Sequence, residues 1–324
     1  MAEHFEVPGS RRFPCTVIAL DLGGTKIAGS LVRYEGRHTA PSVGERRAVP
    51  TMAAEGGSAV LARMVDLARG LAACVPPDAP LAGCGVSTAG YIDEASGCVT
   101  YANSIMPGWA GQKVGPALVD ALGVPCAVMN DVRAYAFGEL RHGAARGCDT
   151  CVVVAAGTGL GGAVIVHGQV LDGAHGFAGM VGHTLHPAAL GKPSAWGTDG
   201  HLESVCAGSG IEACYRLAGG EELTGPQISA RADAGEPLAR SVIEQSGRSL
   251  GEAIASWADL LDPDLVVVGG SVCAAGPVWR EALEAGVEAR IDPMLRGLPV
   301  VDAQLGADAP LIGAAERLLD KLGA

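Results

Sequence analysis

Apolar residues in this chain of 324 residues come in short runs and in longer stretches with helical spacing, and the two kinds alternate. Short runs rich in Val, Ile and Leu predict strands, whereas apolar residues that recur every three or four positions predict helices. The predicted strands cover Cys15–Leu22, Ile27–Tyr34, Val43–Val49, Ala82–Ser87, Cys126–Met129, both arms of a hairpin within Val152–Val166, and Leu265–Gly270. The predicted helices cover Ser58–Cys74, Val114–Leu122, Asp131–Arg141, Ala239–Leu261, Val278–Ile291 and Ala309–Leu322. Hairpins that alternate with helices predict an α/β protein with a mixed sheet in each half.

Two of the predicted hairpins have the same form. VIALDLGGTKIAGSLV at 17–32 and VVVAAGTGLGGAVIV at 152–166 each join two apolar runs through a turn of glycine and threonine. Glycine allows backbone N–H groups to approach an anion and adopts positive φ without a steric cost. One such turn is weak evidence, because hairpins use glycine in any case. Two of them, one in each half, predict related half-domains that bind one polyphosphate.

The composition is that of a globular protein with a substantial core. Hydrophobic residues make up 48% of the chain and charged residues 18%, and the length suggests about two domains. The net charge of −12 argues against a nucleic-acid partner but leaves room for ATP, which binds with its own Mg²⁺. Residues 1–13 read as a disordered tail without the apolar core of a signal peptide. No apolar span is long enough to cross a membrane, so we expect a cytoplasmic protein.

The ten cysteines lie mostly in apolar contexts, which favours buried reduced thiols over disulfides. Cys148 and Cys151 form a C-x-x-C pair that stands alone. Because a structural zinc site needs four ligands, the favoured interpretation is two thiols at the start of a strand.

The first glycine turn carries the residue types of a phosphate and magnesium site. Asp21 ends the first predicted strand and is followed by Gly23, Gly24, Thr25 and Lys26. A carboxylate at this place can hold Mg²⁺, and Thr25, the backbone N–H groups and Lys26 can meet phosphate oxygens. The alternative is an ordinary hairpin turn with an Asx-type cap.

The second turn favours the phosphate interpretation, because Thr158 and Gly159 repeat the same chemistry in the other half. Gly269 and Gly270 follow a further strand, where bare backbone would let an adenosine approach.

The order of the motifs DLGGTK, PGW, ND, GTGLGGA, GFAG-x-x-GH and VVVGGS resembles the ROK family (repressor, open reading frame, kinase). That family includes bacterial glucokinases and N-acetylmannosamine kinases, and the resemblance extends from Val17 to the last helix. It implies an actin-like, ribonuclease-H-like ATPase fold with two α/β domains that flank an active-site cleft. The small domain would be 14–127 together with the C-terminal helix 309–324, and the large domain would be 128–308. The resemblance further implies a hinge near 125–131 and a homodimer, with sugar and ATP as small-molecule partners.

The resemblance also assigns roles to individual residues. Asp131 matches the catalytic base, which must take a proton from a sugar hydroxyl as that hydroxyl attacks the γ-phosphorus. The alternative for Asp131 is a helix cap. The positions that match sugar ligands are Gly90, Asn103, Asn130, His183 and Glu203, and Met180 stands where glucokinase-like members carry a glutamate.

The zinc motif of the family is degenerate in this chain. The resemblance assigns zinc to the Gly-His element and to three cysteines, but Ser194, Trp196 and His201 stand in their places. We therefore expect no zinc, although His183 and His201 could supply two ligands, with Asp199 or His186 as others. Without zinc, packing of Trp196 or hydrogen bonds must hold the loop.

Met180 bears on the choice of sugar. Methionine accepts hydrogen bonds poorly but can lie against an acetyl methyl group, which favours an N-acetylated hexosamine over glucose. Alternatively, Met180 only fills a gap in the pocket.

Three functions are compatible with these observations. The leading hypothesis is an ATP-dependent kinase of a hexose or N-acetylhexosamine, with N-acetylmannosamine and its 6-hydroxyl the best guess and glucose the alternative. A ROK repressor would need a DNA-binding module before the first hairpin, which begins near the N-terminus of an acidic chain. The third hypothesis is a sugar-binding or regulatory protein that has lost catalysis.

Overall fold

The computed structural model describes residues 13–102, 106–192, 194 and 197–323. Its contacts divide the chain into two compact units, one that ends at Gly143 and takes up the chain again from Ala307, and a second over Ala144–Gly306. The predicted tail at 1–13 lies outside the described residues except for Phe13. Asn103 and Trp196 also lie outside them.

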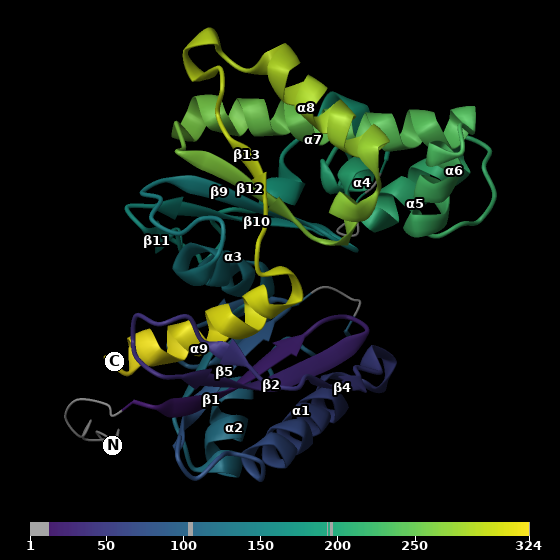
Figure 1. Cartoon of the computed structure of the whole chain (residues 1–324). Coiled ribbons are helices and arrows are strands. Elements are labelled where there is room, and N and C mark those ends of the chain that lie inside the picture. The colour runs from purple at the N-terminus through teal and green to yellow at the C-terminus, as the bar shows by residue number, and fades with distance from the viewer. Residues whose placement is uncertain (1–12, 103–105, 193, 195–196, 324) are drawn as a thin grey trace. The chain divides into compact units, whose positions relative to one another are not determined.

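The first unit is built on a mixed sheet with the strand order β3-β2-β1-β5-β8, and β4 also pairs with β2 (Figure 1). β1 is antiparallel to β2 and parallel to β5, which in turn is parallel to β8. The strands are β1 (Cys15–Leu22), β2 (Lys26–Tyr34), β3 (Ser42–Val43), β4 (Arg47–Pro50), β5 (Leu81–Thr88) and β8 (Cys126–Asn130). A small hairpin of β6 (Tyr91–Asp93) and β7 (Cys98–Tyr101) stands apart from this sheet.

Helices cover both faces of this sheet (Figure 1). The helices of the unit are α1 (Gly57–Ala72), α2 (Val114–Leu122), α3 (Asp131–His142) and α9 (Ala309–Lys321). Side chains alternate along β1, so Ile18 and Leu20 pack with α1 and α2, whereas Val17 and Ala19 pack with α9. Burial on both faces explains why β1 reads as a continuous apolar run.

α3 belongs to the first unit, although the sequence analysis assigned 128–142 to the second domain. α3 and α9 pack closely, and a Cβ at Gly313 would lie 1.8 Å from the carbonyl oxygen of Ala134. Such an approach tolerates only glycine. The contacts therefore place the division after α3, whereas the predicted boundary lies between 127 and 128, and the hinge near 125–131 stays a prediction.

The second unit repeats the pairing pattern of the first. Its strand order is β11-β10-β9-β12-β13, with β9 antiparallel to β10 and parallel to β12, and β12 parallel to β13 (Figure 1). The strands are β9 (Cys151–Ala156), β10 (Leu160–Val166), β11 (Gln169–Val170), β12 (Leu265–Gly269) and β13 (Val300–Asp302). An antiparallel hairpin followed by parallel strands on one side is the shared plan, as the two glycine turns predicted.

Helices cover one face of the second sheet. They are α4 (Glu203–Cys206), α5 (Gly208–Leu217), α6 (Gly225–Asp233), α7 (Pro237–Leu261) and α8 (Pro277–Arg290). Val152, Val154 and Ala156 of β9 share one core with Ile254 of α7 and Trp279 of α8. In the described part of the stretch 172–202, the regular elements are the short 3-10 helices η2 (Val181–His183) and η3 (Pro187–Ala189), in line with its lack of period.

None of the helices in the described part of the chain has both the length and the apolar character needed to cross a bilayer. The ten cysteines all lie among the described residues and form no disulfide. Burial raises the pKa of Cys151 to about 12, so that thiol is unreactive at neutral pH.

Candidate functional site

The turn between β1 and β2 is fixed by hydrogen bonds from residues of the first unit. The Gly23 N–H donates to the Lys26 carbonyl at 3.0 Å. The Thr51 hydroxyl donates to the Gly23 carbonyl at 2.8 Å, and the Thr51 N–H donates to the Thr25 carbonyl at 2.9 Å. Gly24, Thr25 and Lys26 are exposed. The turn is thus fixed by contacts to its carbonyl groups while its tip faces solvent.

Asp21 is the second-to-last residue of β1, just before this glycine turn, and it lies beside Ser87 of β5 in the parallel register. The Ser87 hydroxyl donates to Asp21 Oδ1 at 2.6 Å. Burial raises the pKa of Asp21 above its usual value, while the Ser87 hydrogen bond and the Lys26 charge lower it. The carboxylate is therefore oriented by a neighbouring strand and stands in a poorly solvated place.

Asn130 and Asp131 occupy the junction of β8 and α3. Asn130 is the N-cap, since its Oδ1 accepts from the N–H groups of Val132 and Arg133 at 3.1 and 3.2 Å. Its Nδ2 donates to the Gly90 carbonyl at 3.1 Å and to Asp131 Oδ1 at 2.8 Å. Asn130 is thus the residue that caps α3.

The Asp131 carboxylate is oriented through one oxygen. Oδ1 accepts from the Val132 N–H at 3.0 Å as well as from Asn130, whereas Oδ2 has no hydrogen-bond partner among the described residues. Burial, reinforced by the negative charge of Asp21, raises the pKa of Asp131 to about 6, and the hydrogen bonds to Oδ1 oppose that rise. A carboxylate with this pKa is ionised at neutral pH and is a better proton acceptor than an ordinary aspartate.

The loop after β5 is fixed from three directions. The Ala89 N–H donates to the Leu22 carbonyl at 3.3 Å, and the buried Trp109 donates its indole N–H to the Ala89 carbonyl at 3.1 Å. The Gly90 carbonyl accepts from Asn130, and Gly90 has a φ of 106°. The PGW motif therefore supports the predicted sugar loop at Gly90, while the predicted ligand Asn103 lies outside the described residues.

In the second unit, the turn between β9 and β10 rests on the start of α5. The Gly157 N–H donates to the Gly159 carbonyl at 2.9 Å, and the Gly208 N–H donates to the Gly157 carbonyl at 2.8 Å. The Ser209 hydroxyl donates to the Thr158 carbonyl at 2.8 Å. Thr158 and Gly159 are exposed. Like the turn between β1 and β2, this turn is therefore fixed through its carbonyl groups while its tip faces solvent.

Gly269 and Gly270 end β12 beside the end of β9. Gly269 pairs with Ala155, and Gly270 has a φ of 97°. A Cβ at Gly270 would lie 2.3 Å from the Ala156 carbonyl oxygen. The close packing of the ends of β9 and β12 therefore requires glycine at position 270 and is by itself no evidence for a ligand there.

The segment with Met180 and His183 packs against β10. Val181 is 5% exposed, and the His183 N–H donates to the Met180 carbonyl at 3.1 Å to form η2. Met180 is half-buried. The His183 ring contacts the ring of Phe177, with 5.9 Å between centroids.

His183, His201 and Glu203 form a cluster in which one possible ligand atom from each residue lies within 4.8 Å of the others. Glu203 is 8% exposed and lies at the start of α4. The two imidazole rings are stacked, with centroids 4.7 Å apart and planes 12° apart. A metal ion lies in the plane of each imidazole that binds it, so these stacked rings cannot both bind one ion without rotating. Burial and the neighbouring His201 lower the pKa of His183, which favours its neutral form.

Hydrogen bonds hold the loop in which the zinc cysteines are replaced. Leu185 and His201 form an isolated β-bridge, and the Leu202 N–H donates to the Thr184 carbonyl at 2.9 Å. The Ser194 N–H donates to the Thr198 carbonyl at 2.9 Å. The predicted plug Trp196 lies outside the described residues.

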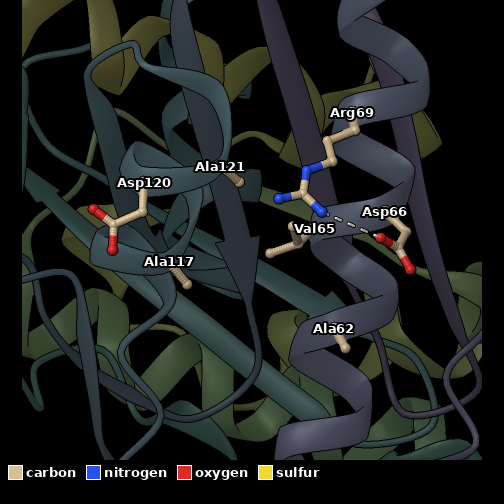
Figure 2. Close-up of a pocket in the computed structure, with 7 residues that line it drawn as sticks. All are labelled: Ala62, Val65, Asp66, Arg69, Ala117, Asp120 and Ala121. Carbon is tan, nitrogen blue, oxygen red and sulfur yellow. Dashed lines mark ion pairs between the residues drawn. The ribbon is translucent and has the colours of Figure 1, made fainter.

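A hollow with a volume of about 360 Å³ lies between α1 and α2 (Figure 2). It is lined by Ala62, Val65, Asp66, Arg69, Ala117, Asp120 and Ala121. In this hollow, a terminal guanidinium nitrogen (Nη1) of Arg69 lies 3.7 Å from Asp66 Oδ1. None of the predicted site residues lines this hollow.

Comparison with known proteins identifies the family. The model of the ROK family matches residues 17–321, so the chain belongs to the ROK family. A glucokinase of Halalkalibacterium halodurans is 29% identical over 91% of this chain and 92% of its own length. An N-acetylmannosamine kinase of Shigella flexneri is 31% identical over 93% of this chain and 97% of its own length.

The solved structure of a ROK family glucokinase from Streptomyces griseus, in complex with glucose and AMPPNP, superposes with a TM-score of 0.76. It is 26% identical and covers 93% of this chain and 98% of its own. The prediction of an actin-like ATPase fold with two α/β units and mixed sheets is confirmed.

Sequence reasoning missed several residues that position the predicted site. Ser87, Thr51, Ser209 and Trp109 orient site residues through hydrogen bonds. Their partners lie 20 to 66 positions away along the chain, so the folded arrangement of strands, loops and α5 brings them together. The order of motifs offered a signal for Trp109 alone, through the PGW element.

Proposed function

We propose that this chain is an ATP-dependent sugar kinase that transfers the γ-phosphoryl group of ATP to a hydroxyl of a hexose or N-acetylhexosamine. The observation that carries this proposal is the state of Asp131. Its Oδ1 is tied to Asn130 and Val132, its Oδ2 is left for a proton, and its pKa is raised to about 6. A structural carboxylate gains nothing from such a pKa, whereas a general base does.

In the proposed reaction, Asp131 Oδ2 accepts the proton of the sugar hydroxyl while that oxygen attacks the γ-phosphorus and the bond to ADP breaks. The rest of catalysis is orientation and charge stabilisation. The exposed tips of the two glycine turns, at Gly23–Lys26 and at Thr158–Gly159, present backbone N–H groups to phosphate oxygens.

The carboxylates of the first unit suit a divalent cation that accompanies ATP. Asp21 is poorly solvated, and its charge raises the pKa of Asp131, so the two carboxylates repel each other. Asp21 would hold Mg²⁺, with Ser87 orienting its carboxylate. When bound there, the ion would supply positive charge against the phosphates.

The predicted sugar ligands of the second unit are Met180, His183 and Glu203. The neutral form of His183, favoured by its lowered pKa, can both donate to and accept from a sugar hydroxyl. Met180 favours an N-acetylated sugar, and we propose N-acetylmannosamine and its 6-hydroxyl as the substrate. Glucose is the second candidate, because relatives of similar identity are named glucokinases.

The test is ADP release in a coupled assay with a panel of hexoses and N-acetylhexosamines. We expect turnover with N-acetylmannosamine to exceed that with glucose. Binding of a sugar without ADP release from any member of the panel would contradict the kinase and favour a binding protein.

A further inference from the structure

The segment 184–203 connects two predicted sugar ligands, His183 at its start and Glu203 at its end. The two arms of the segment are joined to each other at several points. The Leu185–His201 bridge is one, and the His186 N–H donates to the Gly200 carbonyl at 3.0 Å. Whatever fixes one arm of this segment therefore fixes both predicted ligands.

His186 connects this segment to the helices behind it. Its side chain is 11% exposed, and its Nδ1 accepts from the Ala188 N–H at 3.3 Å, which caps η3. Since Nδ1 accepts, the proton of the neutral ring is on Nε2. Nε2 lies 3.4 Å from Glu252 Oε2 on α7. Burial lowers the pKa of His186, although the Glu252 charge opposes this, so the neutral ring with Nε2–H is the form expected near pH 7.

The other oxygen of Glu252 lies 3.6 Å from Arg290 Nε on α8. η3, which His186 caps, packs against α4, and Ala189 of η3 shares the buried core with Leu202 just before Glu203. A continuous set of contacts thus leads from α7 through His186 and η3 to Glu203.

We propose that Glu252 is a positioning residue of the sugar site. Through His186 it ties the segment 184–203 to α7, in a chain whose zinc cysteines are replaced. Glu252 acts without touching the sugar, so its loss should weaken sugar binding and leave the ATP side of the reaction intact. This inference rests on the proposed function for its kinetic consequence.

The test compares Glu252→Ala, Glu252→Gln and Glu244→Ala in the full chain. Glu244 is the matched control, because it lies on α7 as well and, among the described residues, its ion pair is with the exposed Arg240 one turn away. We expect Glu252→Ala to raise the KM for sugar about tenfold, since the contact between His186 Nε2 and the Glu252 carboxylate is lost, with the KM for ATP unchanged. Glu252→Gln keeps an acceptor for the His186 Nε2–H and should restore most of the loss. Glu244→Ala should behave as the wild type.

A second measurement does not depend on activity. Hydrogen exchange of the amides of His186 and Leu202, which bond across the segment, should accelerate in Glu252→Ala and stay unchanged in Glu244→Ala. His186→Asn keeps a capping oxygen for Ala188 but cannot reach Glu252, so it should reproduce Glu252→Ala, and the double variant should add nothing further.

The two possible failures are distinguishable. If wild-type protein releases no ADP with any sugar, the proposed function fails, and the exchange rates still decide whether Glu252 holds the segment. If the wild type is an active kinase but Glu252→Ala has the sugar KM and the exchange rates of Glu244→Ala, this inference is overturned. Equal rises in the KM for sugar and for ATP would also overturn it.

Discussion

Replacement of Asp131 by asparagine should make the protein more stable and nearly inactive. Asparagine keeps an Oδ1 acceptor for Val132 and Asn130 but carries no charge and cannot take a proton. We expect turnover to fall by roughly 10²–10⁴-fold, the usual contribution of a general base, with sugar binding nearly unchanged.

The stability gain follows from the raised pKa. The pKa of Asp131 rises from 3.8 to about 6 on folding. At 1.36 kcal/mol per pKa unit, the ionised carboxylate therefore lowers the free energy of unfolding by about 3 kcal/mol at neutral pH. Because the folded state binds this proton more tightly than the unfolded state, stability falls as the pH rises from about 4 to about 6 and is then constant. Asparagine is neutral and does not lower the free energy of unfolding in this way. The variant should therefore be about 1–3 kcal/mol more stable than the wild type above pH 6.

Urea unfolding at pH 7.5 and at pH 4.5, without nucleotide or divalent cation, measures both sides of this prediction. The difference in free energy of unfolding should be at its full value at pH 7.5 and fall to roughly a third of that value at pH 4.5, because the carboxyl is then protonated in the folded state but still mostly ionised in the unfolded state. An equal difference at both pH values would refute the electrostatic reasoning. A variant that keeps more than a tenth of the wild-type turnover would refute the role of Asp131 as the base.

Three further predictions concern pH, zinc and sugar choice. The kcat/KM for sugar should fall as the pH drops below about 6, because Asp131 must be deprotonated to act, and a profile that is flat down to pH 5 would contradict this. Purified protein should contain substantially less than one zinc per chain, and atomic absorption that finds one equivalent, with activity lost on chelation, would show that the stacked His183 and His201 rotate to bind it. Met180→Glu should shift the ratio of kcat/KM values toward glucose by about tenfold. The carboxylate can accept a hydrogen bond from a glucose hydroxyl, whereas the acetyl methyl group of N-acetylmannosamine loses its apolar contact. An unchanged ratio in that variant would mean that Met180 only fills space.

The sequence predicted the central strands of both sheets because those strands are largely apolar, but it did not predict β11 and β13 at the edges of the second sheet. Cys15–Leu22 and Val114–Leu122 have the predicted bounds. The predicted strand Val43–Val49 is instead two short strands, β3 and β4, which both pair with β2 on either side of Gly44. α5 and α6 were not predicted, since Gly-Ser-Gly and Gly-Pro at their starts hide the helical period.

The site was predictable where it depends on motifs and not where it depends on register. Asp131 at the start of a helix follows from the order of residues, and its assignment as base stays a prediction. The hydrogen bond from Ser87 to Asp21 depends on the parallel register of β1 and β5, which one sequence does not specify. The contact of His186 with Glu252 likewise depends on how an irregular segment packs against a helix.

The central claim is tested most directly by following phosphoryl transfer from γ-labelled ATP to sugar, with wild type and Asp131→Asn side by side. We expect N-acetylmannosamine labelled with phosphate at its 6-position, formed by the wild type and reduced by roughly 10²–10⁴-fold in the variant. Label released only as inorganic phosphate, or sugar phosphate formed equally by both proteins, would contradict it.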